Sequence, residues 1–270
     1  MMKKTMPPDG PDSWQQHHLR PAVAERVVAD GRIGPGERVL EVGPGSGALT
    51  RALLTVGAQV AAIELDPQRA ASLHERFATE LADGRLQLLV GDARLLQPAV
   101  AAPWRVVANP PFQHTAELLR RWLLEDLPDG PPTAIDLVLQ TQAVQKLCSR
   151  PPQQAQSGVL VQAWGRAHRG RSLQRDDVEP PSRVPLACLS LRQHQDAPAP
   201  AVLRRLDRLL AAGFAGPQRL RDALRGLATP RILTRQGQEH GYRPDDHPRT
   251  LSVPAWLALA DFLHGIGRLE

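Results

Sequence analysis

Short apolar runs rich in β-branched residues alternate with longer helical stretches over the first 165 residues of the chain. This alternation is typical of βαβ units, which build a mostly parallel sheet covered by helices on both faces. We therefore expect an α/β fold. The predicted strands are residues 39–42, 60–65, 86–90, 106–108, 135–139 and 159–161, and the predicted helices are 21–30, 48–56, 67–82, 115–127 and 142–148.

The character of the sequence changes beyond the predicted sheet. Amphipathic stretches at 201–212, 217–227 and 254–263 are separated by Gly and Pro, which predicts a small helical domain. We expect a loose amino-terminal tail over residues 1–14, a catalytic domain over 15–190 and a helical domain over 191–270, with the boundary between 175 and 200.

A glycine-rich segment interrupts the first strand-to-helix transition. In "VLEVGPGSGALT", Gly43, Gly45 and Gly47 follow the strand that contains Glu41. Glycines allow a tight turn and the close approach of a ligand to the backbone. The spacing is G-x-G-x-G, and no lysine follows as in a phosphate-binding P-loop, so a diphosphate cradle is disfavoured.

Acidic residues end the next two predicted strands. Glu64 follows Gly43 by 21 residues and can accept hydrogen bonds from both hydroxyls of a ribose. Asp92 ends the third strand and can reach an adenine amino group. Taken singly, Glu64 could be a surface acid and Asp92 a helix cap. Together with the glycine loop they predict a site for a single nucleoside, and S-adenosylmethionine has that form.

The fourth strand ends in Asn109-Pro110-Pro111-Phe112. Proline fixes φ and lacks an N–H donor, so this loop should be stiff and its carbonyls available. The Asn109 side-chain oxygen and the Pro110 carbonyl can accept both protons of an adenine amine, which favours attack of the nitrogen on a sulfonium methyl. Phe112 can stack on a base removed from its helix. The alternative is a structural loop with Phe112 in the core.

Composition limits the class of protein. No apolar run reaches the roughly 18 residues that a membrane span needs, and the first 16 residues lack the apolar centre of a signal peptide, so we expect a cytoplasmic protein. The only cysteines, Cys148 and Cys188, and the nine histidines show no metal-ligand spacing, so neither a disulfide nor a metal site is predicted.

Arginine dominates the basic residues. The net charge is +5, and only three of the 33 basic residues are lysines. This bias fits either a phosphate-seeking surface or a solvated face without function. The candidates for RNA contacts are Arg120 and Arg121, after the catalytic loop, and the dense group Arg166, Arg169 and Arg171.

These motifs together resemble the Erm/KsgA family of rRNA adenine-N6 methyltransferases. "QHHLRPAVAERVV" is similar to the family's Q-N-F-L segment, "VLEVGPGSGALT" to its cofactor loop, "AIELD" and "GDA" to its ribose and adenine contacts, and "NPPF" to its catalytic segment. The later stretches "DLVLQTQAVQKLC" and "VEPPSRVPLACLSL" also match, the latter imperfectly. The resemblance implies a Rossmann-like class I S-adenosylmethionine-dependent methyltransferase sheet with a small C-terminal helical domain.

The resemblance also implies site residues. Gln16, His17 and Leu19 would join the cofactor site from the amino-terminal segment, and Leu65 and Ala93 would do so beside the two acids. The family usually has Asn-Phe where this chain has His17-His18, which puts the expected amide contact to the cofactor in question.

The form of the catalytic segment also resembles one branch of the family. Pro110 and Phe112 are more similar to Erm-type 23S rRNA methyltransferases than to the KsgA type, which usually carries N-L-P-Y. This implies a monomeric enzyme that methylates one adenine of 23S rRNA, free or in immature 50S particles, and thereby confers macrolide, lincosamide and streptogramin B resistance. The alternatives are a KsgA-type 16S rRNA dimethyltransferase, a DNA adenine or protein glutamine methyltransferase, and a non-catalytic RNA-binding factor.

Overall fold

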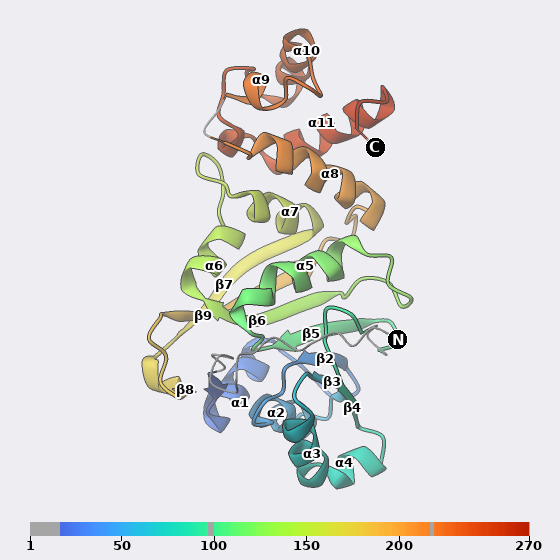
Figure 1. Ribbon diagram of the computed structural model, residues 1–270, viewed down its shortest axis with the longest axis vertical. Coiled ribbons are helices and arrows are strands. Elements are labelled where there is room, and N and C mark those ends of the chain that lie inside the picture. The colour runs from blue at the N-terminus through green and yellow to red at the C-terminus, as the bar shows by residue number, and fades with distance from the viewer. Residues whose placement is uncertain (1–16, 97–99, 217–218, 270) are drawn as a thin grey trace, which may run out of the picture.

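The computed structural model describes residues 17–96, 100–216 and 219–269. A sheet of seven strands forms its centre, in the order β4-β3-β2-β5-β6-β9-β7 (Figure 1). The five strands from β4 to β6 are parallel, and β9 and β7 continue the sheet in antiparallel pairs. The strands are β2 Arg38–Val42, β3 Gln59–Glu64, β4 Leu86–Val90, β5 Trp104–Ala108, β6 Ala134–Gln140, β7 Gly165–Leu173 and β9 Leu186–Gln193.

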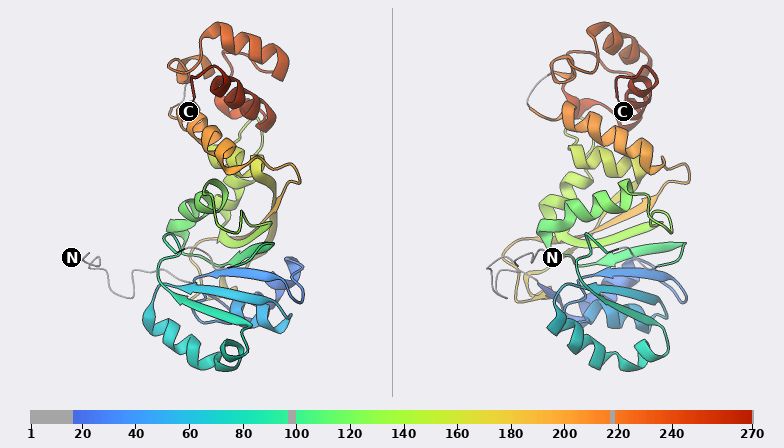
Figure 2. Two further views of the ribbon diagram at one scale, coloured as in Figure 1. Left: turned by 90° about the vertical axis from the view of Figure 1, so that its right-hand side faces the viewer. Right: turned by 45° about the vertical axis from the view of Figure 1, so that its right-hand side comes forward.

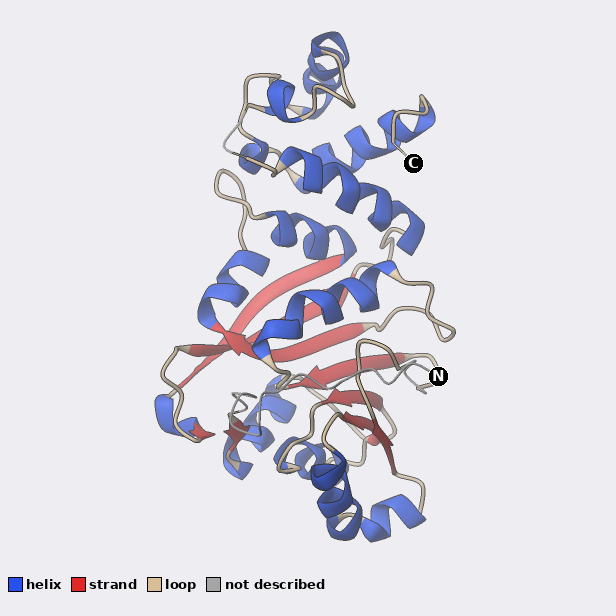
Figure 3. Ribbon diagram, viewed as in Figure 1, coloured by secondary structure: helices blue, strands red, loops and turns tan. Residues whose placement is uncertain are grey.

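Helices cover both faces of this sheet, as Figure 3 shows. Alternate residues of β2 separate the two cores: Val39 packs with the helices of one face, whereas Leu40 and Val42 pack with those of the other. The first face is covered by α1 Pro21–Asp30, α2 Ala48–Thr55 and α3 Pro67–Arg76, and the short α4 Ala78–Ala82 lies near β4. The second face is covered by α5 Thr115–Leu124, α6 Thr141–Leu147 and α7 Gln156–Trp164.

The C-terminal helices form the far end of the molecule along its longest axis (Figure 2). They are α8 Pro200–Gly213, α9 Leu220–Ala223, α10 Pro230–His240 and α11 Val253–Gly265. Leu203 and Leu206 of α8 and Trp256 of α11 are fully buried in the same apolar cluster that lies under α5 and α7. The helical end therefore rests directly on the helices that cover the sheet.

Two sequence predictions differ from this structure, and strands β7 and β9 and one helix were not predicted. Residues 159–161 lie inside α7 rather than in a strand: a short apolar run does not distinguish a strand from a helix buried on nearly all sides, and α7 is enclosed between the sheet, α8 and α11. The helix predicted over 67–82 is interrupted at Phe77, whose φ of −112° and ψ of 28° are not helical. Helix α10 was not predicted, because it is mostly polar; only Leu233, Gln236 and Gly237 of it are buried.

The predicted domain limits fall outside the described chain or close to an element end. The tail over residues 1–14 lies outside the described residues. Strand β9 continues to Gln193 and α8 begins at Pro200. The division at 190/191 thus stays a prediction, and the sheet extends three residues beyond it.

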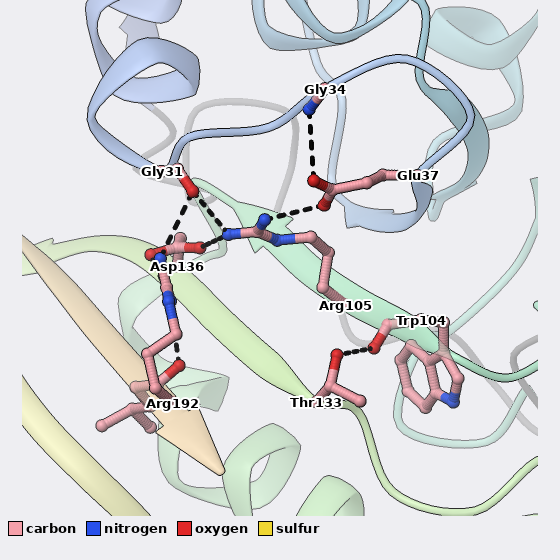
Figure 4. Close-up of polar contacts among 9 residues, drawn as sticks. Gly31, Gly34, Glu37, Trp104, Arg105, Thr133, Asp136 and Arg192 are labelled. Carbon is pink, nitrogen blue, oxygen red and sulfur yellow. Dashed lines mark hydrogen bonds and ion pairs between the residues drawn. The ribbon is translucent and has the colours of Figure 1, made fainter.

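A buried ionic cluster joins several of these elements (Figure 4). Arg105 of β5 contacts Asp136 of β6 at 2.6 Å and Glu37 at 2.8 Å, and it also donates to the Gly31 carbonyl at 2.8 Å. Arg192 of β9 contacts the other oxygen of Asp136 at 2.9 Å. Because Arg105 is the second residue of β5, the cluster lies away from the carboxyl end of that strand and holds together the middle of the sheet.

Within the described ranges, no helix is both long and apolar enough to span a bilayer.

Candidate methyl-transfer site

The glycine loop joins β2 to α2 with three left-handed residues. Gly43, Gly45 and Gly47 have φ values of 70°, 54° and 77°, which disfavour any residue with a Cβ atom. A Cβ on Gly45 would lie 2.6 Å from Nδ1 of His18. The sequence prediction of a tight turn is therefore confirmed, and the loop is in close contact with the amino-terminal segment.

Strands β2 and β5 lie side by side in the sheet, although β3 and β4 separate them in sequence. The chain proceeds outward from β2 in one direction to β4 and then returns to β5 on the other side. Ligands of open α/β sheets bind at such a switch point, outside the carboxyl ends of the strands. The topology thus brings the glycine loop and Asn109 to one edge of the sheet.

Glu64, at the end of β3, turns its carboxylate toward the glycine loop. Oε2 accepts a hydrogen bond from the Gly45 N–H at 3.1 Å, and Oε1 accepts one from the Asp66 N–H at 3.0 Å. The side chain is buried, whereas the following Leu65 is 45% exposed. A carboxylate beside a glycine loop and an exposed apolar side chain next to it are suited to a ribose and to the face of a base.

Glu41 lies buried beneath the same loop. The Thr50 hydroxyl donates to its Oε2 at 2.7 Å. Burial raises the pKa of Glu41 to about 8, and the neighbouring Glu64 adds to this shift, while the bond from Thr50 opposes it. Glu41 therefore holds a proton at neutral pH and supports the loop as a neutral group.

Asp92 lies in the turn after β4 and is held by Arg94. The Arg94 Nη2 contacts Oδ2 at 2.6 Å, and its backbone N–H donates to Oδ1 at 2.9 Å. The side-chain bond from Arg94 holds the pKa of Asp92 below its usual range. Ala93 packs against the core below the turn. Asp92 is thus an ionised acceptor in a fixed orientation.

Asn109 directly follows β5. Its Nδ2 donates to the backbone oxygen of His17 at 2.6 Å. Because the amide donates at this end, its Oδ1 is directed elsewhere and is the acceptor end of the group. Pro110 is buried, and the half-buried Phe112 begins a 3₁₀ turn, η2 (Phe112–His114), that leads into α5. The ring of Phe112 lies 6.3 Å from that of His17.

The amino-terminal segment reaches this site as a short strand, β1 (His18–Leu19). It pairs antiparallel with β8 (Val178–Glu179), and the His17 Nδ1–H donates to the Pro180 carbonyl at 2.7 Å. Leu19 is buried in the core with α1 and α2. Gln16 lies outside the described residues. The "VEPPS" stretch of the sequence therefore holds the amino-terminal segment over the glycine loop.

A hollow lies between β1 and the glycine loop and is lined by residues that include His17, His18, Glu41, Gly43 and Asn109. Its open space is only about 20 Å³, room for about one water molecule, because the His18 ring lies against Gly45. Burial lowers the pKa of His18, and the nearby Arg69 adds to this effect. This space is too small for a nucleoside as the His18 ring now lies. The carboxyl group of Glu41 and the backbone groups of the glycine loop in the lining are hydrogen-bonding groups of the kind that a nucleoside can use.

The arginine predictions divide into two groups. Arg121 is buried and donates to the Arg94 carbonyl, which is at odds with the expectation that it contacts RNA. Arg120 forms a two-pronged ion pair with Asp207 of α8 and thereby joins α5 to the helical end. Arg166, Arg169 and Arg171 lie on β7, an exposed edge strand, where Arg171 pairs with Asp30 at 2.9 Å. The RNA contacts of the β7 arginines stay a prediction.

Comparison with known proteins decides the family. Residues 12–238 match the ribosomal RNA adenine dimethylase family. The chain belongs to this family. Its enzymes are methyltransferases that use S-adenosylmethionine. Two similar relatives are proteins named ribosomal RNA small subunit methyltransferase A. The one from Thermosynechococcus vestitus is 33% identical over 92% of this chain and 94% of its own length. The one from Caulobacter vibrioides is 33% identical over 92% and 95%.

Two solved structures share the fold of this chain. The 23S rRNA methyltransferase ErmE superimposes with a TM-score of 0.72 at 22% identity, covering 92% of this chain and 99% of that one. A dimethyladenosine transferase from Plasmodium falciparum gives a TM-score of 0.76 at 18% identity, covering 94% and 99%. The expected Rossmann-like methyltransferase sheet with a helical C-terminal part is therefore confirmed. At these identities the similarity concerns the fold only.

The predicted membership of the rRNA adenine methyltransferase family is confirmed. The prediction that the chain belongs to the Erm type within it is not confirmed. Relatives at about one-third identity over nearly the whole chain carry the small-subunit name, which favours the KsgA-type alternative. The prediction of the Erm type depended on Pro110 and Phe112 alone. Similarity over 92% of the chain is stronger evidence than two positions. Arg94 was not among the site residues predicted from the sequence. An arginine two residues after an acid, directly beyond a strand, can fold back on that acid, and this spacing could have indicated its role.

Proposed function

We propose that this protein transfers methyl groups from S-adenosylmethionine to N6 of an adenine in the 16S rRNA of the small ribosomal subunit. The observation that carries the proposal is the fixed amide of Asn109 beside the glycine loop. Its Nδ2 is bound to the His17 carbonyl at 2.6 Å, so its oxygen is the end available to an amine. The small-subunit target rests on the relatives with that name.

The proposed chemistry needs no strong base. S-adenosylmethionine would supply an electrophilic methyl group on a sulfonium. The Asn109 oxygen and the Pro110 carbonyl would accept hydrogen bonds from the two N–H groups of the adenine amine, and these bonds strengthen as positive charge grows on the nitrogen. As the N–CH3 bond forms, the bond from the methyl to sulfur would break and S-adenosylhomocysteine would leave, and the methylated amine would then lose one proton to water. Phe112 would stack on the displaced base. Glu64, Leu65 and Asp92 would hold the nucleoside part of the cofactor.

A second target has a specific observation in its favour. The chain carries Asn109-Pro110-Pro111-Phe112, the form that resembles Erm-type enzymes. On this alternative the substrate is an adenine of 23S rRNA, and expression would confer macrolide, lincosamide and streptogramin B resistance.

Labelled cofactor separates the two targets. The protein is incubated with 30S particles, naked 16S rRNA, naked 23S rRNA and DNA, incorporated label is counted for each substrate, and the modified adenine is located by blocked primer extension on the rRNA. We expect label in 30S particles and none in 23S rRNA or DNA. Label confined to 23S rRNA would establish the second target. Cofactor binding without transfer to any of these substrates would instead support a non-catalytic RNA-binding factor.

A further inference from the structure

Arg94 holds Asp92 from both its side chain and its main chain. The Nε atom lies 3.0 Å from Oδ1 and from Oδ2, and Nη2 lies 2.6 Å from Oδ2. The backbone N–H adds a fourth contact at 2.9 Å. The carboxylate that is expected to accept from the adenine of the cofactor therefore has one fixed orientation.

The same guanidinium also reaches the segment that follows Phe112. Its Nη1 donates to Glu117 Oε2 at 3.0 Å, in the first turn of α5, and lies 3.3 Å from Nδ1 of His114. A guanidinium presents five donors in a planar fork and can bridge two sites at once, which a lysine ammonium does less well. One side chain thus spans the gap between the carboxyl end of β4 and the start of α5.

A second contact joins the same two elements through the main chain of Arg94. The buried Arg121 of α5 donates through Nη1 to the backbone oxygen of Arg94. The loop after β4 and helix α5 are therefore joined through both the side chain and the main chain of residue 94. These contacts connect the turn that carries Asp92 with the helix that follows the catalytic segment.

We propose that Arg94 is a positioning residue for methyl transfer. It sets the position of the adenine-binding acid Asp92 relative to the catalytic segment Asn109–Phe112, so that one side chain aligns the cofactor with the target base. This inference rests on the proposed function. It assigns Arg94 no direct contact with either reactant.

A phosphate contact is the competing role for a partly exposed arginine. Arg94 has a carboxylate on each side, Asp92 at 2.6 Å and Glu117 at 3.0 Å. These two charges offset the guanidinium charge and occupy its donors. The local charge balance therefore favours a bridge within the protein over a clamp on RNA.

The chain contains a matched control at the other end of β4. Arg85 folds back on Asp83 with the same spacing: its Nε lies 2.9 Å from Oδ2 and its backbone N–H lies 3.1 Å from Oδ1. This pair precedes Leu86, the first residue of β4, and so lies at the opposite end of the strand from Asp92. Arg85→Met removes an equivalent local contact without touching the site.

The test compares Arg94→Met, Arg94→Lys, Glu117→Ala and Arg85→Met in the full chain. For Arg94→Met we expect the dissociation constant of S-adenosylmethionine, measured by calorimetry, to rise at least fivefold and kcat on the rRNA substrate to fall at least tenfold. Arg94→Lys should recover much of the cofactor affinity and little of kcat. Glu117→Ala should lower kcat and leave cofactor affinity within about twofold.

Hydrogen exchange gives a readout that does not depend on turnover. The His114 amide is bonded to the Pro111 carbonyl at 3.1 Å, and its exchange should accelerate in Arg94→Met and Glu117→Ala but not in Arg85→Met. Unchanged exchange and cofactor affinity in Arg94→Met would overturn the proposal. A change only in the salt dependence of RNA binding would do so too, because the loss of a phosphate contact reduces the slope of that dependence.

Failure of the proposed methyl-transfer function would give a different result from failure of the proposed role of Arg94. In that case the parent protein would transfer no methyl group to any rRNA. The effects of Arg94→Met on cofactor affinity and on the exchange of η2 and α5 amides would still decide whether Arg94 aligns the two elements.

Discussion

The side-chain nitrogen of Asn109 donates a hydrogen bond of 2.6 Å to the backbone oxygen of His17, 92 residues earlier in the chain. This bond joins the carboxyl end of β5 to the short strand β1 above the glycine loop. It makes the amide part of both the catalytic segment and the cover of the proposed cofactor site. The orientation of the amide oxygen therefore depends on where the amino-terminal segment lies.

Replacing Asn109 tests this relationship. Asn109→Ala removes the acceptor for the amine, and Asn109→Asp replaces the donor to His17 with a carboxylate oxygen that would face the carbonyl. We expect both to reduce methyl transfer by at least about 100-fold, the size of effect seen when one oriented transition-state contact is lost. Transfer is measured with labelled cofactor and cofactor affinity by calorimetry.

The two substitutions of Asn109 should differ in their effect on cofactor affinity. Asn109→Ala should keep cofactor affinity within a few-fold, whereas Asn109→Asp should weaken it more, because repulsion displaces His17. Gln113→Ala, at an exposed position in the next turn, serves as the control and should retain full activity. Undiminished transfer by Asn109→Ala would remove the catalytic role.

Removing Asp136 should destabilise the fold strongly. Its side chain is 8% exposed and is shared by Arg105 and Arg192, so Asp136→Ala leaves the buried Arg105 without its closest counter-charge. Loss of one partner of a buried pair costs about 3–5 kcal/mol of unfolding free energy. Urea denaturation followed by circular dichroism measures the change.

An exposed ion pair provides the comparison for Asp136. Asp30 and Arg171 are 44% and 41% exposed, so solvent and salt screen the attraction between their charges. Asp30→Ala should therefore change the midpoint of urea denaturation little. If Asp136→Ala and Asp30→Ala lowered the free energy of unfolding equally, the ionic cluster around Arg105 would stabilise the fold no more than a surface ion pair does.

Glu41 should make the stability of the protein depend on pH. Folding raises the pKa of this carboxyl from 4.5 to about 8, so the folded state keeps a proton that the unfolded state releases between these values. The contribution of Glu41 to stability therefore falls as pH rises from about 4.5 to about 8, by at most about 1.4 kcal/mol per pH unit. Glu41→Gln should remove this slope.

Urea unfolding at several pH values, without cofactor, measures the effect of Glu41→Gln. Glu75→Gln, at an exposed position of α3, should reproduce the parent curve. The idea of a neutral buried Glu41 fails if Glu41→Gln is less stable than the parent at pH 8 and shows the same slope.

Gly45 and Gly36 differ in their surroundings although both have positive φ. A Cβ on Gly36 would meet nothing within 4 Å, whereas one on Gly45 would lie 2.6 Å from the His18 ring. Alanine at either position should cost about 1–2 kcal/mol of unfolding free energy through its backbone conformation. Gly45→Ala should cost more, because the ring must also move.

A double-variant cycle isolates the contact between Gly45 and His18. His18→Ala in the Gly45→Ala background should recover the additional loss, and the same exchange in the Gly36→Ala background should recover nothing. If the effects of Gly45→Ala and His18→Ala on the free energy of unfolding were additive, the His18 ring would not contact the glycine loop in solution.

The sequence by itself determined the local parts of this protein. Gly43, Gly45 and Gly47 permit a tight turn with positive φ, and the strands that end at Glu64 and before Asn109 follow from short apolar runs between turn residues. The alternation of such runs with helices also determined the fold class, because few arrangements bury both faces of a parallel sheet.

Only the tertiary structure decided which of these parts meet. The order of β2 and β5 in the sheet, the bond from Asn109 to His17 and the reach of Arg94 to Glu117 join residues that are distant in sequence. Burial likewise removed Arg121 from the candidate RNA surface and made a helix of residues 159–161. Packing and long-range hydrogen bonds depend on the whole chain, and a local pattern carries no information about a partner that lies in another element.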